Sequence, residues 1–222
     1  MNSLVIRNAS LQNLEQLRQI EEKAWSTPGE NVCANPEKIK QRILTYPIGT
    51  SVAFCEKQPI GSQYAFKMQW DGNIESLKSW DFHTKEGWIN QAHDPSGGTG
   101  FLVGVGVVPE FRGIRFEQGI IDNQKKYKAS QMLIAFTLKN LFADQVRRVI
   151  GCARVPFYHQ KSQLSIGDYC ALRLPDGRLF DPVLRFHEFM GAQIVKPIKY
   201  AMEDQESLNA GCWVVYKYPF KG

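Results

Sequence analysis

The chain has 222 residues, of which 43% are hydrophobic and 22% charged, and its formal net charge at pH 7 is +5. These values fit one soluble globular domain that buries its core without metal or disulfide staples. No long apolar run suits a membrane span, and the Lys and Arg residues are scattered, so we expect neither a membrane nor a nucleic acid as partner.

The five cysteines indicate a reducing compartment. None of them forms a C-x-x-C pair and their number is odd, so we expect free thiols in a cytoplasmic protein. The start of the sequence, residues 1–7, lacks the apolar core of a secretory signal. No histidine or cysteine pair has the spacing of metal ligands, so we expect no metal.

Hydrophobic periodicity predicts strands and helices in alternation over the first third of the chain. Leucine, isoleucine and alanine recur at helical spacing between Leu11 and Ala24, and Ser10 is a suitable N-cap. Pro36 suits the first position of a second helix. The predicted order is strand 4–9, helix 11–25, loop 26–34, helix 36–43, strand 50–55, turn 58–61 and strand 62–68.

The next stretch, residues 70–98, has the weakest pattern. It allows a short helix at 74–80 and ends in Asp-Pro-Ser-Gly-Gly, so we expect a flap or insertion over the acceptor side of a site. Clear patterns return after it and predict strand 101–108, helix 129–142, strand 148–155, helix 181–190, and strands 194–198 and 212–218. This order predicts a single α/β domain over residues 1–222, with a mixed sheet.

An anion-binding signal lies between the buried strand at 101–108 and the helix that begins at Ala129. A turn from strand to helix presents backbone N–H groups and the positive end of a helix dipole, which favour a pyrophosphate. Arg112 and Lys128 add positive charge, Gly113 permits close approach of the backbone, and Ala129 and Ser130 are small. The same residues also fit an ordinary turn between a strand and a helix.

Two motifs resemble those of GNAT acyltransferases. Val107-Val108-Pro109-Glu110-Phe111-Arg112-Gly113 is similar to the end of the fourth strand and the start of the acetyl-CoA loop of that family. Lys128-Ala129-Ser130-Gln131-Met132-Leu133 fits the helix that follows the loop, but only after an extra stretch, residues 114–127. Either the loop carries an insertion, or residues 115–119 form a variant loop and the helix begins earlier. Residues 184–192 resemble the late GNAT helix, with His187 where many members carry tyrosine.

The resemblance implies a GNAT fold, in which helices flank a central, mixed and mostly antiparallel sheet. It also implies that acetyl-CoA or malonyl-CoA binds as acyl donor, through Val107, Val108, Arg112, Gly113, Lys128, Ala129 and Ser130. Three further segments, 93–97, 154–159 and 181–187, resemble a GNAT subgroup that includes domains initiating polyketide biosynthesis by malonyl decarboxylation and transfer to an acyl carrier protein.

Histidine suits the proton transfers that acyl transfer needs near neutral pH. The resemblance places His187 near the thioester sulfur, where it can act as catalytic acid, although a carboxylate could instead hold it in a structural role. His159 follows the strand at 148–155 and is a second catalytic candidate or a loop-capping residue. His93 is expected to order its own loop, and His83 has no supporting context.

Trp25 and Arg173 are candidate substrate contacts: Trp25 ends the first helix beside the expected acceptor cleft, and Arg173 could bind a carboxylate. Alternatively, Trp25 is an aromatic residue of the core and Arg173 a solvated loop residue. No G-x-S-x-G sequence is present, which fits direct attack without a nucleophilic serine. The leading hypothesis is transfer of an acyl group to an amine or a carrier thiol. A malonyl-thioester decarboxylase and a non-catalytic acyl-CoA-binding module stay open as alternatives.

Overall fold

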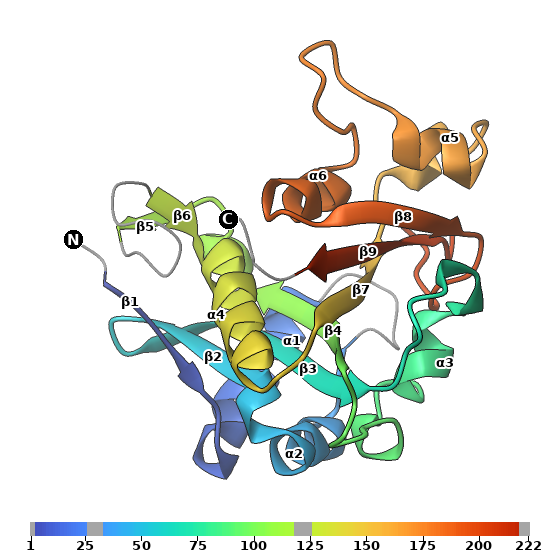
Figure 1. Ribbon diagram of the computed structural model, residues 1–222. Helices are drawn as coiled ribbons and strands as arrows, with labels where there is room; N and C mark the ends of the chain where they lie inside the picture. Colours follow the sequence, from blue (N-terminus) through green and yellow to red (C-terminus); the bar gives the residue numbers. More distant parts are fainter. Residues whose placement is uncertain (1–2, 26–32, 118–125, 218–222) are drawn as a thin grey trace.

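A seven-stranded sheet with helices on both faces forms the framework of the protein (Figure 1). The computed structural model describes residues 3–25, 33–117 and 126–217. The strand order is β1-β2-β3-β4-β7-β9-β8, and neighbouring strands run antiparallel except for β4 and β7. The predicted fold class, a mixed and mostly antiparallel sheet flanked by helices, is therefore confirmed.

The strands of this sheet are β1 (Leu4–Asn8), β2 (Thr50–Cys55), β3 (Gln58–Met68), β4 (Thr99–Val107), β7 (Arg148–Arg154), β8 (Gln193–Ile198) and β9 (Gly211–Lys217). A separate hairpin consists of β5 (Arg115–Glu117) and β6 (Lys126–Lys128). The helices are α1 (Leu14–Ala24), α2 (Pro36–Thr45), α3 (Trp80–Thr84), α4 (Ala129–Ala143), α5 (Ile166–Ala171) and α6 (Pro182–Phe189).

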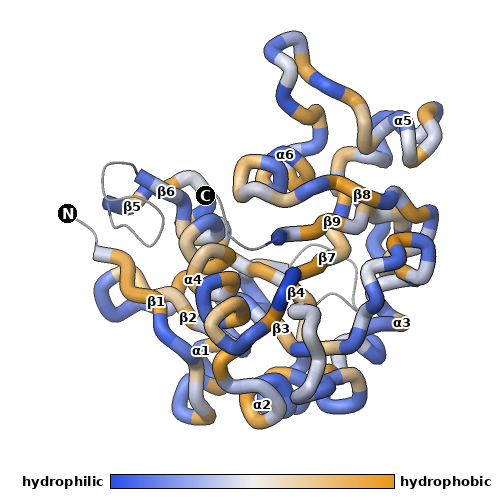
Figure 2. The backbone as a smooth tube through the Cα atoms, viewed as in Figure 1, coloured by the Kyte–Doolittle hydropathy of each residue, from blue (hydrophilic) through white to orange (hydrophobic). Residues whose placement is uncertain are grey.

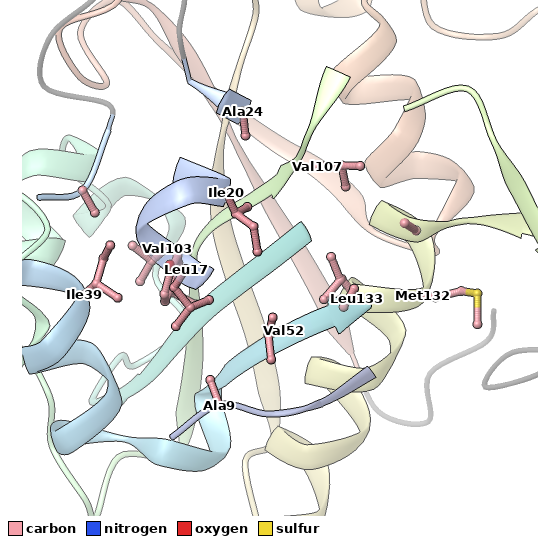
Figure 3. Close-up of a cluster of buried hydrophobic side chains, with 14 of the residues drawn as sticks. Ala9, Leu17, Ile20, Ala24, Ile39, Val52, Val103, Val107, Met132 and Leu133 are labelled. Atoms are coloured by element: carbon pink, nitrogen blue, oxygen red, sulfur yellow. The ribbon is translucent and has the colours of Figure 1, made fainter. Parts of the chain in front are cut away.

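The core consists of two clusters of buried side chains. In the first, Leu17, Ile20 and Ile39 of α1 and α2 belong to one cluster with Leu133 of α4, and Figure 3 shows Leu17 and Ile20 beside Val103 of β4. In the second, residues of α4, α5 and α6, among them Leu138, pack together. Hydrophobic stretches in α4 and β9 stand out in Figure 2. Burial of these apolar faces is the main force that holds the helices on the sheet.

Local sequence signals set several boundaries as predicted. The Asn35 side chain accepts a hydrogen bond from the Lys38 N–H (2.9 Å) and caps α2, with Pro36 in the first turn. The α4 helix begins at Ala129, so the extra residues before it are an insertion that contains the β5–β6 hairpin. Residues 118–125 of that insertion lie outside the described part of the chain.

Two local predictions were wrong. The turn expected at residues 58–61 lies instead at Glu56 and Lys57, where Glu56 adopts a φ of 56°, and β3 already begins at Gln58. Pro59 is tolerated inside β3 because it pairs with Phe54 at a register shift, where ladder hydrogen bonds are interrupted. The helix expected at 74–80 is a single 3-10 turn followed by α3.

Within residues 3–25, 33–117 and 126–217, no helix has both the length and the apolar character needed to cross a membrane. The same residues contain no cluster of three or more His, Cys, Asp or Glu side chains that could hold a metal ion. All five cysteines are described, and each is a free thiol.

Candidate active site

The central feature of the site is a separation of two parallel strands. β4 and β7 pair only from Thr99 with Arg148 to Leu102 with Gly151, although both strands continue further. Their facing edges therefore diverge toward Val107 and Arg154. A cavity of about 510 Å³ lies at this point and is lined by residues 102–107 of β4 and 151–154 of β7.

The cavity is lined from both faces of the sheet. Residues of α4, its N-cap and α6 line one side: Lys128, Ala129, Ser130, Ile134, Pro182, Val183, Phe186 and His187. Residues of α1, α2, α3 and the β8–β9 connection line the other: Glu21, Ala24, Arg42, Trp80, Asp81, Met202, Glu203 and Glu206. Two molecules entering from opposite faces can therefore meet between β4 and β7.

A β-bulge shapes the β4 edge of the cavity. Tyr64 of β3 pairs with Gly104 and Ala65 pairs with Leu102, so Val103 is the extra residue on β4. The Trp80 indole N–H donates a hydrogen bond to the Val103 carbonyl at 2.9 Å. The bulge is thereby fixed, and its carbonyl satisfied, by a side chain that itself lines the cavity.

Gly104 leaves the β4 backbone open to the cavity. A Cβ atom built on Gly104 would meet no atom within 4 Å. A Cβ atom on Gly106, two residues along the strand, would instead lie 3.1 Å from the Ala24 Cβ and 3.2 Å from the Trp25 Nε1. The open face of the strand is therefore concentrated at Gly104.

The start of α4 opens onto the same cavity. Lys128, Ala129 and Ser130 line it, and the Lys128 N–H donates to the Gln131 side-chain oxygen (2.8 Å). The first-turn N–H groups of a helix have no intrahelical partner and carry the positive end of its dipole. This end of the cavity therefore suits an anionic group such as a pyrophosphate.

Of the residues expected to hold the cofactor, Val107, Arg112, Lys128, Ala129 and Ser130 line the cavity. Val108 and Gly113 do not. Val108 is buried and donates its N–H to the Ile60 carbonyl (2.9 Å), which continues the β3–β4 ladder. Gly113 is exposed and leads into the β5–β6 hairpin.

Arg112 ties the end of β4 to the end of α1. Its Nε donates to the Val107 carbonyl at 3.0 Å and its Nη2 to the Ala24 carbonyl at 2.7 Å. The guanidinium group thus forms hydrogen bonds within the protein. From the sequence we had expected its charge to be directed at the pyrophosphate of the cofactor.

We expect Arg112→Gln to lower the free energy of unfolding by about 1–2 kcal/mol, because both carbonyl hydrogen bonds are lost. Chemical denaturation measures the change. Lys139→Gln, an exposed charge removal on α4, is the matched control and should leave the midpoint within error. Equal stability of the two variants would show that the Arg112 clamp contributes nothing.

His187 is the histidine that lines the cavity. It is 8% exposed, and its Nδ1 lies 2.7 Å from the Tyr216 hydroxyl. Burial lowers the pKa of His187 to about 4. The imidazole is therefore neutral at physiological pH, whereas we expected a pKa nearer neutrality from the sequence. The alternative carboxylate partners, Glu188 and Asp181, make other hydrogen bonds: Asp181 caps α6, and Glu188 pairs with Arg173.

The other three histidines lie outside the cavity lining. His159 is exposed, and its Nδ1 lies 2.8 Å from the Pro156 carbonyl and 2.9 Å from that of Glu206, so it is not brought together with His187. His93 accepts a hydrogen bond from the Lys67 N–H (3.2 Å) and packs on Tyr46. His83 accepts one from the Lys78 N–H (3.0 Å).

The two candidate substrate contacts are separated. Trp25 lines the cavity, and the Arg154 guanidinium lies 5.7 Å from the centre of its ring. Arg173 does not line the cavity: it is half-exposed, donates to the Gly177 carbonyl (2.7 Å) and pairs with Glu188 (3.0 Å). A role for Arg173 in binding a carboxylate there has no geometric support.

The segment 70–98 forms a wall of the cavity. The Trp80 N–H donates to the Ala201 carbonyl (2.8 Å), and the Lys196 ammonium donates to the carbonyl groups of Ile74 (3.3 Å), Glu75 (3.0 Å) and Leu77 (3.3 Å). Leu77 is buried. The segment is therefore attached to the β8–β9 region by several contacts, and its opening as a flap stays a prediction.

Several cavity residues were missed at the sequence level, among them Glu21, Arg42 and Tyr64. The sequence does contain a signal for Glu21 and Arg42. Glu21 falls within the helical stripe that includes Leu17 and Ala24, and Arg42 lies three residues after Ile39, so both are charges within an apolar face. A charge in that position is either paired or functional.

No family model matches the sequence. The uncharacterized N-acetyltransferase YkwB of Bacillus subtilis (strain 168) is 26% identical over 221 residues, which cover 98% of this chain and 90% of that protein. The loading GNAT-like domain of CurA from Lyngbya majuscula superposes with a TM-score of 0.77 at 25% identity, covering 97% of this chain and 98% of that one. The GphF GNAT-like decarboxylase in complex with isobutyryl-CoA superposes with a TM-score of 0.71 at 26% identity, covering 96% and 98%.

These similarities extend over nearly the whole chain. The chain thus belongs to the GNAT superfamily and, within it, resembles the subgroup that contains the polyketide-loading GNAT-like domains.

Proposed function

We propose that the protein is an acyl-CoA-dependent acyltransferase that passes an acyl group to an acceptor amine by direct attack on the thioester. The observation that carries this proposal is the cavity between β4 and β7, which is lined from both faces of the sheet and has the start of α4 on one side. The similarity to a GNAT-like decarboxylase in complex with isobutyryl-CoA supports an acyl-CoA as the donor.

In this proposal the donor enters from the α4 side. The first turn of α4 and Lys128 receive the pyrophosphate, and the pantetheine arm follows the edge of β4 that β7 leaves unpaired beyond Leu102. The thioester then lies near the divergence of the strands, within reach of His187. The acceptor approaches from the side of α1, α2 and α3, where Glu21 offers a carboxylate for its proton.

A second candidate is decarboxylation of a malonyl thioester, with or without transfer to an acyl carrier protein. The similarity to the CurA loading domain and to the GphF decarboxylase favours it. The guanidinium groups that line the cavity are those of Arg42, Arg112 and Arg154, so a malonyl carboxylate would have to be recognised there and not by Arg173. Carbon dioxide release without an acceptor is the diagnostic reaction.

The experiment that separates these functions is incubation of the protein with acetyl-CoA or malonyl-CoA, with and without a panel of amines. Mass spectrometry follows loss of the thioester, and evolved carbon dioxide is trapped in parallel. Amine-dependent consumption of acetyl-CoA supports acyl transfer, whereas amine-independent carbon dioxide from malonyl-CoA supports decarboxylation. Binding of the thioester without turnover of either would leave a non-catalytic acyl-CoA-binding module.

Acyl-CoA should also raise the melting temperature, since a ligand that binds the native state stabilises it by RT ln(1 + [L]/Kd). We expect Lys128→Glu to reduce this shift strongly, because it reverses a charge at the helix end that would receive the pyrophosphate. Lys139→Glu, the same charge reversal on the exposed side of α4, is the control. The absence of any shift at millimolar acetyl-CoA and malonyl-CoA would argue against the donor site.

A further inference from the structure

Glu21 and Arg42 are buried residues of opposite charge that line the cavity without contacting each other. Glu21 is 2% exposed and Arg42 4% exposed. The two side chains nevertheless form no ion pair within 4.0 Å. Buried charges are usually in direct contact with a partner, because only close pairing offsets the loss of hydration. The acceptor side of the cavity therefore presents a carboxylate and a guanidinium group that do not satisfy each other.

Two residues of β3 set the distance between these charges. The Ser62 hydroxyl donates to the Glu21 carboxylate (3.3 Å). The Arg42 guanidinium lies 4.7 Å from the centre of the Tyr64 ring. Ser62 and Tyr64 are alternate residues of one strand, so they face the same side of the sheet about 7 Å apart. The two charges are therefore neighbours on one wall, with a spacing that suits an amine and a carboxylate within one small molecule.

Both charged groups keep hydrogen-bonding capacity. Glu21 accepts a second hydrogen bond from the Ala34 N–H (3.2 Å), and each of its oxygens has a further lone pair. Within the described part of the chain, Arg42 donates through Nε alone, to the Gly87 carbonyl (3.3 Å). The two terminal nitrogens of the guanidinium are the ones that bind a carboxylate in a forked pair.

The Tyr64 hydroxyl is a third group of this wall. Tyr64 is 1% exposed and lines the cavity, and its hydroxyl forms no hydrogen bond with the described residues. Burial raises the pKa of Tyr64, and the nearby Glu21 carboxylate raises it further. The hydroxyl therefore keeps its proton and is a donor. A buried donor without a partner is unfavourable unless a ligand or water accepts its hydrogen bond.

The neighbours of Arg42 favour an anion. Lys38 lies one turn earlier on α2, and its pKa is lowered first by burial and then by the Arg42 guanidinium, so a second positive charge is close. The Lys38 ammonium also opposes the rise that burial causes in the pKa of Asp81. Cys33, near Glu21 and Arg42, is a neutral thiol because burial raises its pKa to about 11.

The other carboxylates of the lining have partners of their own. Asp81 accepts a hydrogen bond from the Tyr200 hydroxyl (3.1 Å), and Glu206 pairs with Arg154 (2.9 Å). Glu203 also interacts with another residue. Glu21 is thus the carboxylate that faces the cavity beside Arg42 and Tyr64.

A zwitterion matches this wall better than a single charge does. A lone ammonium would leave Arg42 without a counter-charge, and a lone carboxylate would lie beside Glu21 as well as Arg42. We infer that the acceptor is an amino acid, or a molecule with the same head group, whose carboxylate binds Arg42 and the Tyr64 hydroxyl while its amine faces Glu21. This inference rests on the proposed acyl transfer and narrows its acceptor class.

The group transfer then balances within the site. The ammonium gives one proton to Glu21, whose pKa is raised by burial and lowered by Arg42. The nitrogen lone pair forms a C–N bond with the thioester carbonyl carbon, and the C–S bond breaks. The nitrogen loses a second proton and the departing thiolate gains one. The products are an amide, the free thiol of coenzyme A and one released proton.

The test compares acceptors that differ in their carboxylate: L-alanine, L-alaninamide and 5-aminopentanoate. With acetyl-CoA as donor, we expect kcat/KM for alanine to exceed that for alaninamide about tenfold, because only alanine forms a charged pair with the guanidinium group. In 5-aminopentanoate the carboxylate is too far from the amine, so this compound should be no better than alaninamide. Calorimetric titration of the protein, with and without coenzyme A, measures the same preference as a dissociation constant.

Tyr64→Phe tests the site without removing a hydrogen bond within the described protein. We therefore expect an unchanged or higher melting temperature, while the affinity for alanine falls about fivefold. The affinity for 5-aminopentanoate should stay the same. Tyr158→Phe is the matched control, because the Tyr158 hydroxyl donates to the Leu164 carbonyl (2.9 Å) outside the lining. It should bind alanine like the unmodified protein.

Arg42→Lys keeps a positive charge near Glu21 but lacks the forked guanidinium group. We expect the preference for alanine over alaninamide to fall from about tenfold to about twofold. If this buried substitution prevents folding, Tyr64→Phe still decides the question.

Equal affinity and equal kcat/KM for alanine and alaninamide would overturn the inference. A loss of malonyl-CoA affinity in Tyr64→Phe, with alanine binding unchanged, would also overturn it, since the bound carboxylate would then belong to the donor. Failure of the proposed acyl transfer looks different, because no amine would then consume acetyl-CoA. The calorimetric preference for alanine decides the inference even in that case.

Discussion

Gly104→Val is expected to abolish transfer to the acceptor while the protein stays folded. The Cβ of the new residue meets no atom within 4 Å, so the substitution creates no clash in the protein. Gly104 pairs with Tyr64 and lies two residues from Gly106, whose Cβ would face Ala24 of α1, so the valine side chain projects into the side of the cavity where we place the acceptor. We expect kcat/KM for the amine to fall by about 100-fold or more, which corresponds to about 2.7 kcal/mol.

The free energy of unfolding should not fall together with the activity. Gly104 lies in the interior of β4 and is not among the glycines with positive φ, so valine suits its backbone. A glycine inside a strand loses more conformational entropy on folding than a β-branched residue does, and replacing it is neutral or stabilising where space permits.

Steady-state kinetics with acetyl-CoA and an amine measures the first effect, and thermal denaturation measures the second. Gly98→Val is the matched control, because a Cβ on Gly98 also meets nothing within 4 Å and Gly98 precedes β4 outside the cavity lining. We expect that control to turn over normally. A Gly104→Val protein that transfers the acyl group as fast as the unmodified protein would place the acceptor away from Gly104.

The strands and helices with strong periodicity were predictable from the sequence. β4 forms a continuous apolar run because it is buried on both faces, and the start of α4 at Ala129 followed from the residues that match the family's helix. The register of the sheet and the position of the β4 bulge were not predictable, because they depend on pairing between residues far apart in the chain.

Short elements escaped prediction for a similar reason. Each strand of the β5–β6 hairpin has three residues and α5 has six, which is too few for a hydrophobic period to emerge. The turn has glutamate, Glu56, at its positive-φ position, where glycine or asparagine is usual. The turn was therefore predicted at Pro59 and Gly61, which follow it in the sequence.

The donor side of the site was more accessible to sequence reasoning than the acceptor side. Lys128, Ala129 and Ser130 are contiguous and border one helix end, so a local motif revealed them. Glu21 and Asp81 are 60 residues apart in numbering, on α1 and α3, and only the tertiary fold brings both to one cavity. His159 was selected for its place after the strand at 148–155 and Arg173 for the charge that it could offer a carboxylate, and both lie outside the lining.

His187 is the remaining candidate for catalysis. When the Tyr216 hydroxyl donates to Nδ1, the neutral imidazole carries its proton on Nε2 and can donate a hydrogen bond to the thioester sulfur as negative charge develops there. We therefore expect His187→Phe to reduce turnover by about 10²-fold, as is common when one such donor is removed. Tyrosine at this position should restore part of the rate.

The free energy of unfolding below pH 6.5 provides a second test of the environment of His187. Because the pKa of His187 is about 4 when folded and 6.5 ordinarily, the unfolded chain binds a proton in this interval that the folded protein does not. Stability therefore falls as the pH decreases from 6.5 to 4. His187→Phe removes this contribution, so the loss of stability over that interval should be smaller in the variant than in the unmodified protein.

Controls separate catalysis by His187 from a structural role. Tyr216→Phe removes the hydroxyl beside Nδ1 but keeps the imidazole, so we expect a smaller loss of turnover than in His187→Phe. His159→Phe alters an exposed side chain outside the cavity lining and should turn over normally. Thermal shift with acetyl-CoA confirms that each variant still binds the donor.

If His159→Phe is inactive and His187→Phe is not, the catalytic histidine is His159. If both turn over normally, the departing thiolate takes its proton from water or from another group in the cavity.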